Sequence, residues 1–178
     1  MAINLKNFLL SQNRKSIIGH FQDLNHIDGV AISTISANLY KDPRDDLVLF
    51  YFRDGANCAS VYTQSKIISE NIKWNLNVKN NSIKALMINT RNANAFTGKL
   101  GFKGIVQIAE ELSKQLTIKM TKDEEKINLV KPDQILFGCT GTIGETFPTE
   151  KIMQSIPTLI KKIKYTQNKY LWIKAAMG

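Results

Sequence analysis

The residues best placed to do chemistry form a glycine-rich turn, GCTGTIG, at residues 138–144. Three glycines within seven residues let the backbone turn sharply after a strand and leave main-chain N–H groups facing outward. Such N–H groups can form an oxyanion hole, which stabilises the negative charge that develops on a carbonyl oxygen during acyl transfer. Glycine-rich turns are also common as structural features, and the Gly-Lys-Ser/Thr ending of a phosphate-binding loop is absent. Both roles, structural turn and oxyanion loop, stay open at this point.

A second polar segment, NTRNANAFTG at residues 89–98, crowds amide and hydroxyl side chains into one loop between a predicted strand and a predicted helix. Asparagine side chains at that density can order a loop by capping main-chain groups. They can also bind a polar substrate, so the segment is a candidate for either role.

The remaining titratable residues carry weaker signals. His20 and His26 have no neighbouring carboxylate or cysteine pattern, which favours ordinary surface or packing roles. Glu145 and Glu150 could serve as acids or bases, but nothing in their spacing distinguishes them from solvated carboxylates. Cys139 lies in the polar turn, where a small space-filling role is favoured over a reactive one.

Five β-prone runs would position these loops. The first three are separated by short turns, which predicts an antiparallel meander. The predicted strands cover 30–36, 47–52, 58–63, 83–88 and 134–137, with turns at 41–46 and 53–57 and a polar, asparagine-rich loop at 71–82. The last strand leads directly into the glycine-rich turn.

Helical patterns occupy the second half of the chain. Apolar residues at three- and four-residue steps predict a helix over about 103–115, which packs on the sheet. The charged stretch 122–126 is an exposed loop or helix end. Two further helices are predicted, one opening at Pro148 with Thr149 as N-cap and one restarting at Pro157, and residues 172–178 again fit a helix. An α+β fold follows, with residues 1–178 as one domain or an incomplete one.

Composition excludes several classes of function. The net charge is +9, but the lysines are scattered, whereas a nucleic-acid interface clusters its charge. The apolar part of the N-terminus is too short for a signal peptide, and no apolar run reaches membrane-spanning length. Cys58 and Cys139 form neither a metal-ligand nor a disulfide pattern. We therefore expect a cytoplasmic protein with no nucleic-acid partner, no membrane segment, no metal and no bound cofactor.

Both polar segments resemble a known enzyme family. NTRNANAFTG at 89–98 is similar to the NSGNANAxTG signature of ornithine acetyltransferases, also called bifunctional glutamate N-acetyltransferases. CTGTIGETFP at 139–148 is similar to that family's STGVIGExxP. Weaker similarities at 46–47, 59–64 and 172–177 extend the resemblance over roughly residues 29–177.

The resemblance implies an αββα fold, in which mostly antiparallel β layers pack between helices, and a precursor that cuts itself between an alanine and a threonine. The freed threonine becomes the nucleophile of a β chain, in a heterotetramer of two α and two β chains. Its hydroxyl takes the acetyl group from N-acetylornithine and passes it to glutamate, in arginine biosynthesis. Acetyl-CoA is an alternative acetyl donor in bifunctional members. Thr140 and Gly141 match the residues that build the family's oxyanion hole.

The sequence also departs from the family pattern. Arg91 replaces a glycine, so the loop is strained or rearranged if that position needs a positive φ or a close backbone approach. Cys139 replaces a serine, a mild change. The Thr-Thr-Asp segment and the Ala-Thr-Met-Leu cleavage site do not occur in these 178 residues, and the one Lys-Gly pair, at 103–104, lies between the two motifs and is not taken as the family's substrate-binding Lys-Gly. The chain is therefore expected to be the α-chain part of the enzyme and silent by itself. The alternatives are a related N-terminal-nucleophile aminopeptidase and a non-catalytic basic binding module.

Overall fold

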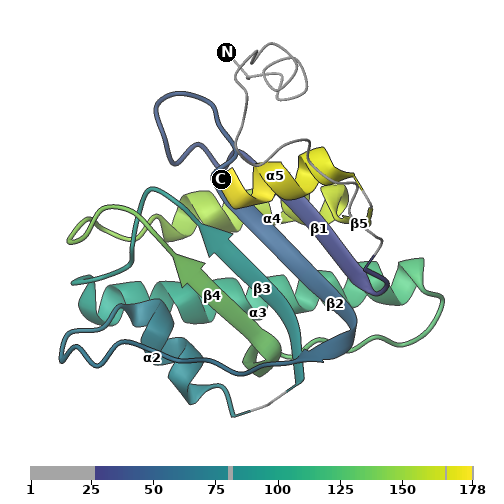
Figure 1. The fold of residues 1–178 in the computed structure, drawn as a ribbon, viewed down its shortest axis with the longest axis horizontal. Helices are drawn as coiled ribbons and strands as arrows, with labels where there is room; N and C mark the ends of the chain where they lie inside the picture. The colour runs from purple at the N-terminus through teal and green to yellow at the C-terminus, as the bar shows by residue number, and fades with distance from the viewer. Residues whose placement is uncertain (1–26, 80–81, 167, 178) are drawn as a thin grey trace, which may run out of the picture.

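A five-stranded sheet in the order β4-β3-β2-β1-β5 forms the centre of the molecule (Figure 1). The computed structural model describes residues 27–79, 82–166 and 168–177. The strands are β1 (Val30–Ile35), β2 (Leu47–Asn57), β3 (Ser82–Asn89), β4 (Ile135–Cys139) and β5 (Lys164–Tyr165). The helices are α2 (Glu70–Asn77), α3 (Gly98–Asp123), α4 (Thr149–Lys162) and α5 (Lys169–Met177), with a short 3₁₀ helix, η1 (Pro132–Gln134).

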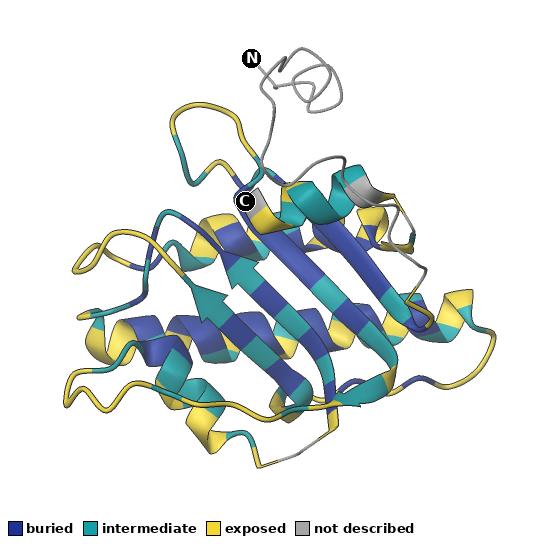
Figure 2. Cartoon of the chain, viewed as in Figure 1, coloured by how far each residue is buried: buried dark blue, intermediate teal, exposed yellow. Residues whose placement is uncertain are grey.

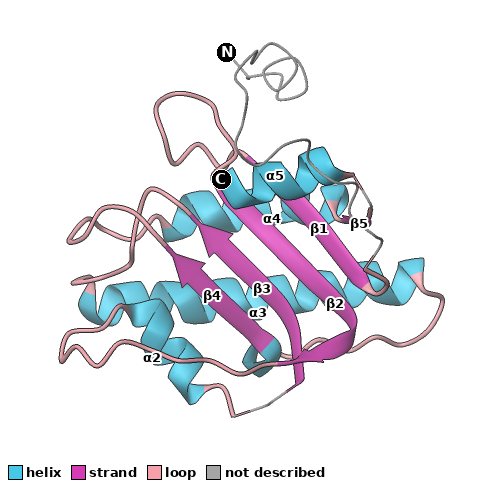
Figure 3. Ribbon diagram, viewed as in Figure 1, coloured by secondary structure: helices cyan, strands magenta, loops and turns pink. Residues whose placement is uncertain are grey.

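Helices α3 and α4 lie side by side on one face of the sheet (Figure 3). Their apolar residues recur at helical spacing and form one core with the inward residues of the strands. Four of these residues are at most 1% exposed: Ile105 and Leu112 of α3, Ile156 of α4 and Met87 of β3. Helix formation and sheet burial therefore depend on the same contacts.

The opposite face of the sheet is less completely covered (Figure 2). Helix α5 packs on this face, where the ring centroids of Trp172 and Phe50 lie 5.7 Å apart. Phe50 belongs to this face because it alternates along β2 with the residues that point into the core. Leu86, Ile88 and Leu136, which alternate with core positions of β3 and β4, are only half-buried. The described residues thus contain a single β layer.

The core predicts a large difference between two positions of α3. Leu112→Ala removes a fully buried side chain and should lower the free energy of unfolding by about 2–5 kcal/mol. Ile118→Ala, on the same helix but 62% exposed, should change it by no more than about 0.5 kcal/mol. Urea unfolding followed by circular dichroism measures both. Equal effects at the two positions would contradict the assigned helix face.

The α+β class is confirmed, and so are most predicted elements. The strands expected at 30–36, 47–52, 83–88 and 134–137 and the helix expected at 103–115 all exist, although that helix is longer, from Gly98 to Asp123. The charged stretch 122–126 contains the end of α3, as expected. Strands β1, β2 and β3 form an antiparallel meander.

The expected turn at 53–57 and strand at 58–63 are both wrong. β2 continues to Asn57, and a register shift between Tyr51 and Ala56 absorbs Gly55 at a φ of +82° as a bulge-like irregularity. Residues 58–63 form no strand, and Val61 is 99% exposed. Their β propensity has no sheet surface to pack against. The third strand of the meander is β3 instead.

Two predictions about helices are also wrong. The expected loop at 71–82 contains α2, which docks on β4 because Trp74 Nε1 donates to the Ile135 carbonyl at 2.8 Å. Residues 149–162 form one helix rather than two, with Pro148 rather than Thr149 at the N-cap. Pro157 lies inside α4 on its exposed side, while Ile156 and Leu159 are fully buried. Packing of these neighbours outweighs the hydrogen bond that proline removes.

Several expectations fall on residues that the structure does not describe. His20, His26 and the N-terminal apolar segment lie outside the described residues. Across the described ranges, no helix has both the length and the apolar character needed to cross a membrane.

Candidate functional site

The two motif loops lie together because they follow neighbouring parallel strands. β3 and β4 pair in parallel, with Asn89 opposite Cys139, and α3 makes the crossover between them. Parallel strands end at the same edge of a sheet, so segments 89–98 and 139–148, about 50 residues apart in the chain, emerge side by side (Figure 1). An isolated parallel bridge between Asn92 and Thr142 continues the pairing beyond the strands.

The asparagines of the first loop are buried and order it. Asn92 Nδ2 donates to the carbonyls of Glu145 and Thr146, both at 3.2 Å, and its Oδ1 accepts the Asn94 N–H at 2.8 Å. Asn89 Nδ2 donates to the Asn92 carbonyl at 2.9 Å. These side chains are 0–3% exposed, so they hold the two loops together and favour the loop-ordering role.

Asn92 predicts a strong effect of an isosteric change. Asn92→Asp replaces a donor to two carbonyls with a carboxylate that only accepts, which leaves both carbonyls facing a negative charge. We expect a loss of about 1–3 kcal/mol or more in the free energy of unfolding at neutral pH, and partial recovery in acid, where the carboxyl is protonated. Thermal unfolding at pH 7 and pH 4 tests this. Wild-type stability at pH 7 would contradict the bridging role.

The glycine-rich turn uses most of its amides in pairing. The Thr140 N–H donates to the Asn89 carbonyl at 3.0 Å, Thr142 to Arg91 at 2.9 Å and Gly144 to Ala95 at 2.9 Å. The sequence-based expectation that the turn leaves its amides outward is therefore wrong for these three. Within the described part of the chain, the Gly141 N–H makes no hydrogen bond, and neither does the exposed Thr140 hydroxyl.

The Thr140 hydroxyl and the Gly141 amide sit on consecutive residues directly after β4, and the Ile143 N–H further along the turn likewise makes no hydrogen bond within the described residues. A hydroxyl and an amide N–H are both suitable donors to a developing oxyanion. The chemistry that these two residues offer is therefore donation of two hydrogen bonds to one acceptor.

Gly141 must be glycine for a local reason. Its φ is +133°, and a Cβ at this position would lie 2.2 Å from the carbonyl carbon of Arg91 and 2.6 Å from the Asn92 nitrogen. Both neighbours are main-chain atoms that cannot move aside without breaking the loop pairing. The close approach of the two loops thus depends on this residue.

Arg91 occupies the position where the sequence departs from the family pattern. Its φ is +76°, so the position does require the left-handed conformation that favours glycine. The guanidinium donates to Thr142 Oγ1 at 2.6 Å and pairs with both carboxylate oxygens of Glu145, at 2.7 and 3.1 Å. The sequence alone did not distinguish Glu145 from a solvated carboxylate, because its partner, Arg91, lies 54 residues away in the other motif.

Cys139 has the structural role that the sequence favours. It packs against the core, and burial raises the pKa of its thiol. A thiol held protonated is a poor nucleophile. Glu150 lies exposed in the first turn of α4. The described residues contain no group of three His, Cys, Asp or Glu side chains arranged to hold a metal ion.

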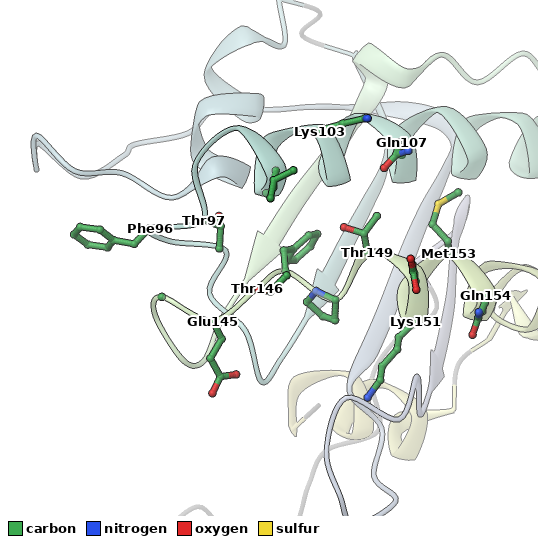
Figure 4. Close-up of a pocket in the computed structure, with 16 residues that line it drawn as sticks. Phe96, Thr97, Lys103, Gln107, Glu145, Thr146, Thr149, Lys151, Met153 and Gln154 are labelled. Atoms are coloured by element: carbon green, nitrogen blue, oxygen red, sulfur yellow. The ribbon is translucent and has the colours of Figure 1, made fainter.

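An open hollow of about 880 Å³ lies beside the loops, between α3 and α4 (Figure 4). Phe96 and Glu145 from the loops, Lys103 from α3 and Met153 from α4 are among the residues that line it. Neither Thr140 nor Gly141 does. The two donors are therefore not part of this hollow.

Comparison with known proteins points to one family. The profile of the ArgJ family matches residues 31–177. The arginine biosynthesis bifunctional protein ArgJ of Bartonella henselae is 30% identical over 159 residues, covering 88% of this chain and 35% of that protein. The protein of the same name from Caulobacter vibrioides is 28% identical over 148 residues, covering 81% and 34%. The chain thus spans about a third of the length of these curated relatives.

Two solved structures share the fold. The crystal structure of arginine biosynthesis bifunctional protein ArgJ from Bacillus halodurans aligns with a TM-score of 0.67 at 22% identity, covering 79% of this chain and 66% of that one. Ornithine acetyltransferase from Mycobacterium tuberculosis, complexed with ornithine, aligns with a TM-score of 0.69 at 20% identity, covering 79% and 70%.

Proposed function

Because this chain belongs to the ArgJ family, we propose that it is the α-chain part of an enzyme that moves an acetyl group from N-acetylornithine to glutamate. One observation carries the proposal: Thr140 and Gly141, on consecutive residues directly after β4, offer a hydroxyl and an amide N–H that make no hydrogen bond within the described part of the chain, while the Thr140 and Thr142 amides on either side are paired. Their roles as oxyanion donors are part of the proposal.

In the proposed reaction, a threonine hydroxyl on a separate β chain attacks the acetyl carbonyl carbon of N-acetylornithine. The carbonyl oxygen becomes an oxyanion, which accepts hydrogen bonds from the Thr140 hydroxyl and the Gly141 amide. The C–N bond then breaks, ornithine leaves with a proton on its amine, and an acetyl ester remains on the threonine. The glutamate amine attacks this ester, giving N-acetylglutamate and restoring the hydroxyl. Acetyl-CoA would replace N-acetylornithine as donor if the enzyme is bifunctional.

We assign the proposed β chain to the less covered face of the sheet. The sheet face that carries Leu86, Ile88 and Leu136 is apolar and half-buried, whereas the opposite face is covered by α3 and α4. A second β layer packed on this face would complete an αββα arrangement. It would also bring the edge with Thr140 and Gly141 against a second polypeptide, which would supply the threonine nucleophile.

Reconstitution tests the proposal. The 178-residue chain is assayed alone and together with the nucleophile-bearing β chain of a relative, for transfer of acetyl from N-acetylornithine to glutamate. We expect product only from the combined chains. Transfer by the isolated chain would contradict the proposal. Hydrolysis of β-peptides by the combined chains, with no acetyl transfer, would assign the site to an aminopeptidase instead.

A further inference from the structure

We propose that Arg91 is a positioning residue, whose guanidinium holds segment 140–145 so that the Gly141 amide and the Thr140 hydroxyl stay preset for an oxyanion. The inference rests on the proposed function for its catalytic consequence. Its structural part, a side-chain clamp between the two motif loops, rests on the geometry of Arg91 alone.

The clamp joins two points of the second loop to one side chain of the first. One guanidinium nitrogen, Nη1, lies 2.6 Å from Thr142 Oγ1 and 2.7 Å from Glu145 Oε2, and Nη2 lies 3.1 Å from Glu145 Oε1. The two-pronged contact with the carboxylate fixes orientation as well as distance. Thr142 and Glu145 flank the bend that follows Gly141, so the guanidinium fixes both sides of that bend.

The main chain of Arg91 supports Gly141 directly. The Arg91 carbonyl accepts the Thr142 N–H at 2.9 Å, and its carbonyl carbon would be 2.2 Å from a Cβ on Gly141. Any shift of Arg91 therefore displaces Gly141, whose amide is the proposed donor. A φ of +76° is unfavourable for arginine and persists only where the surroundings fix the conformation. The hydrogen bonds of the guanidinium are such surroundings.

Arg53 provides a matched comparison. It also forms ion pairs with two carboxylates, Asp28 and Asp54, and its side chain is 32% exposed, against 35% for Arg91. Its partners lie near the other end of β2, however, and it contacts neither motif loop. An effect common to surface arginine pairs would appear at both positions, and an effect of the clamp only at Arg91.

The first test measures amide hydrogen exchange at Thr142 and Gly144 in the 178-residue chain, which needs no enzymatic activity. Arg91→Ala keeps the Cβ at positive φ and removes the clamp, whereas Arg91→Gly also relieves the backbone. We expect both Arg91 variants to speed exchange at these amides at least about tenfold. Glu145→Gln should speed it to a smaller degree. Arg53→Ala should leave them unchanged. Exchange within twofold of wild type in both Arg91 variants would overturn the proposal.

The second test uses the combined chains and acetyl transfer. Arg91→Gly removes the guanidinium, and the lysine of Arg91→Lys cannot make the two-pronged contact. Both variants should therefore lower kcat about tenfold or more, with little change in KM. Unchanged kcat despite faster exchange would overturn the catalytic part. If the wild-type combined chains transfer no acetyl group, the proposed function fails, and the exchange result alone decides whether the clamp exists.

Discussion

Thr140→Val in the combined enzyme should lower the rate of acetyl transfer about 100- to 1,000-fold, the usual effect of removing one oxyanion donor. Valine keeps the branched shape and removes only the hydroxyl. Because Thr140 is exposed and its hydroxyl has no partner in the described part of the chain, the free energy of unfolding should change little. The loss should fall on kcat, since the oxyanion forms in the transition state and not in the bound substrate.

Thr146→Val is the matched control for this substitution. Thr146 is an exposed threonine in the same segment, and its carbonyl rather than its hydroxyl accepts the bond from Asn92. We expect nearly wild-type turnover from it. Equal turnover of the two variants would remove Thr140 from the proposed oxyanion pair.

Gly141→Ala should both destabilise the chain and abolish turnover. A left-handed backbone costs a residue with a Cβ about 1–3 kcal/mol, and the overlap with Arg91 and Asn92 main-chain atoms adds about 1–3 kcal/mol of overpacking. We therefore expect a loss of about 3 kcal/mol or more in the free energy of unfolding. Urea unfolding of the 178-residue chain measures it.

Gly144→Ala separates the two costs. Gly144 has a φ of +81°, but a Cβ there would meet no atom within 4 Å. Only the backbone cost of about 1–2 kcal/mol should appear. A Gly141 variant no less stable than the Gly144 variant would show that the two loops approach each other less closely than described.

Much of the fold followed from local patterns. The apolar periodicity that predicted a helix at 103–115 lies within the buried face of α3, and the β-prone runs that became β1, β2 and β3 match the sheet in order. The errors arose where tertiary contacts decide. Trp74 fixes α2 to β4 across 61 residues of sequence, and Val61 has a strand-like neighbourhood but no partner strand. Local propensity predicts neither the docking of α2 nor the lack of a partner strand near Val61.

The site was predictable in part. Motif spacing marked both loops, but their proximity depends on β3 and β4 pairing in parallel, which an expected antiparallel meander does not imply. The glycine-rich turn was recognised as a donor loop, yet the pattern of residue types could not tell which amides the pairing consumes. Arg91 does have the positive φ, +76°, on which the expectation of a strained or rearranged loop depends, whereas its pairing with Glu145 could not be foreseen from sequence.

The most direct measurement is a crystal structure of the combined enzyme trapped with an acetyl group on its nucleophile. We expect the acetyl carbonyl oxygen to lie about 3 Å from both the Gly141 nitrogen and the Thr140 hydroxyl oxygen, with segment 140–145 unmoved. An acetyl oxygen held by donors from elsewhere, with Gly141 and Thr140 out of hydrogen-bond reach, would contradict it.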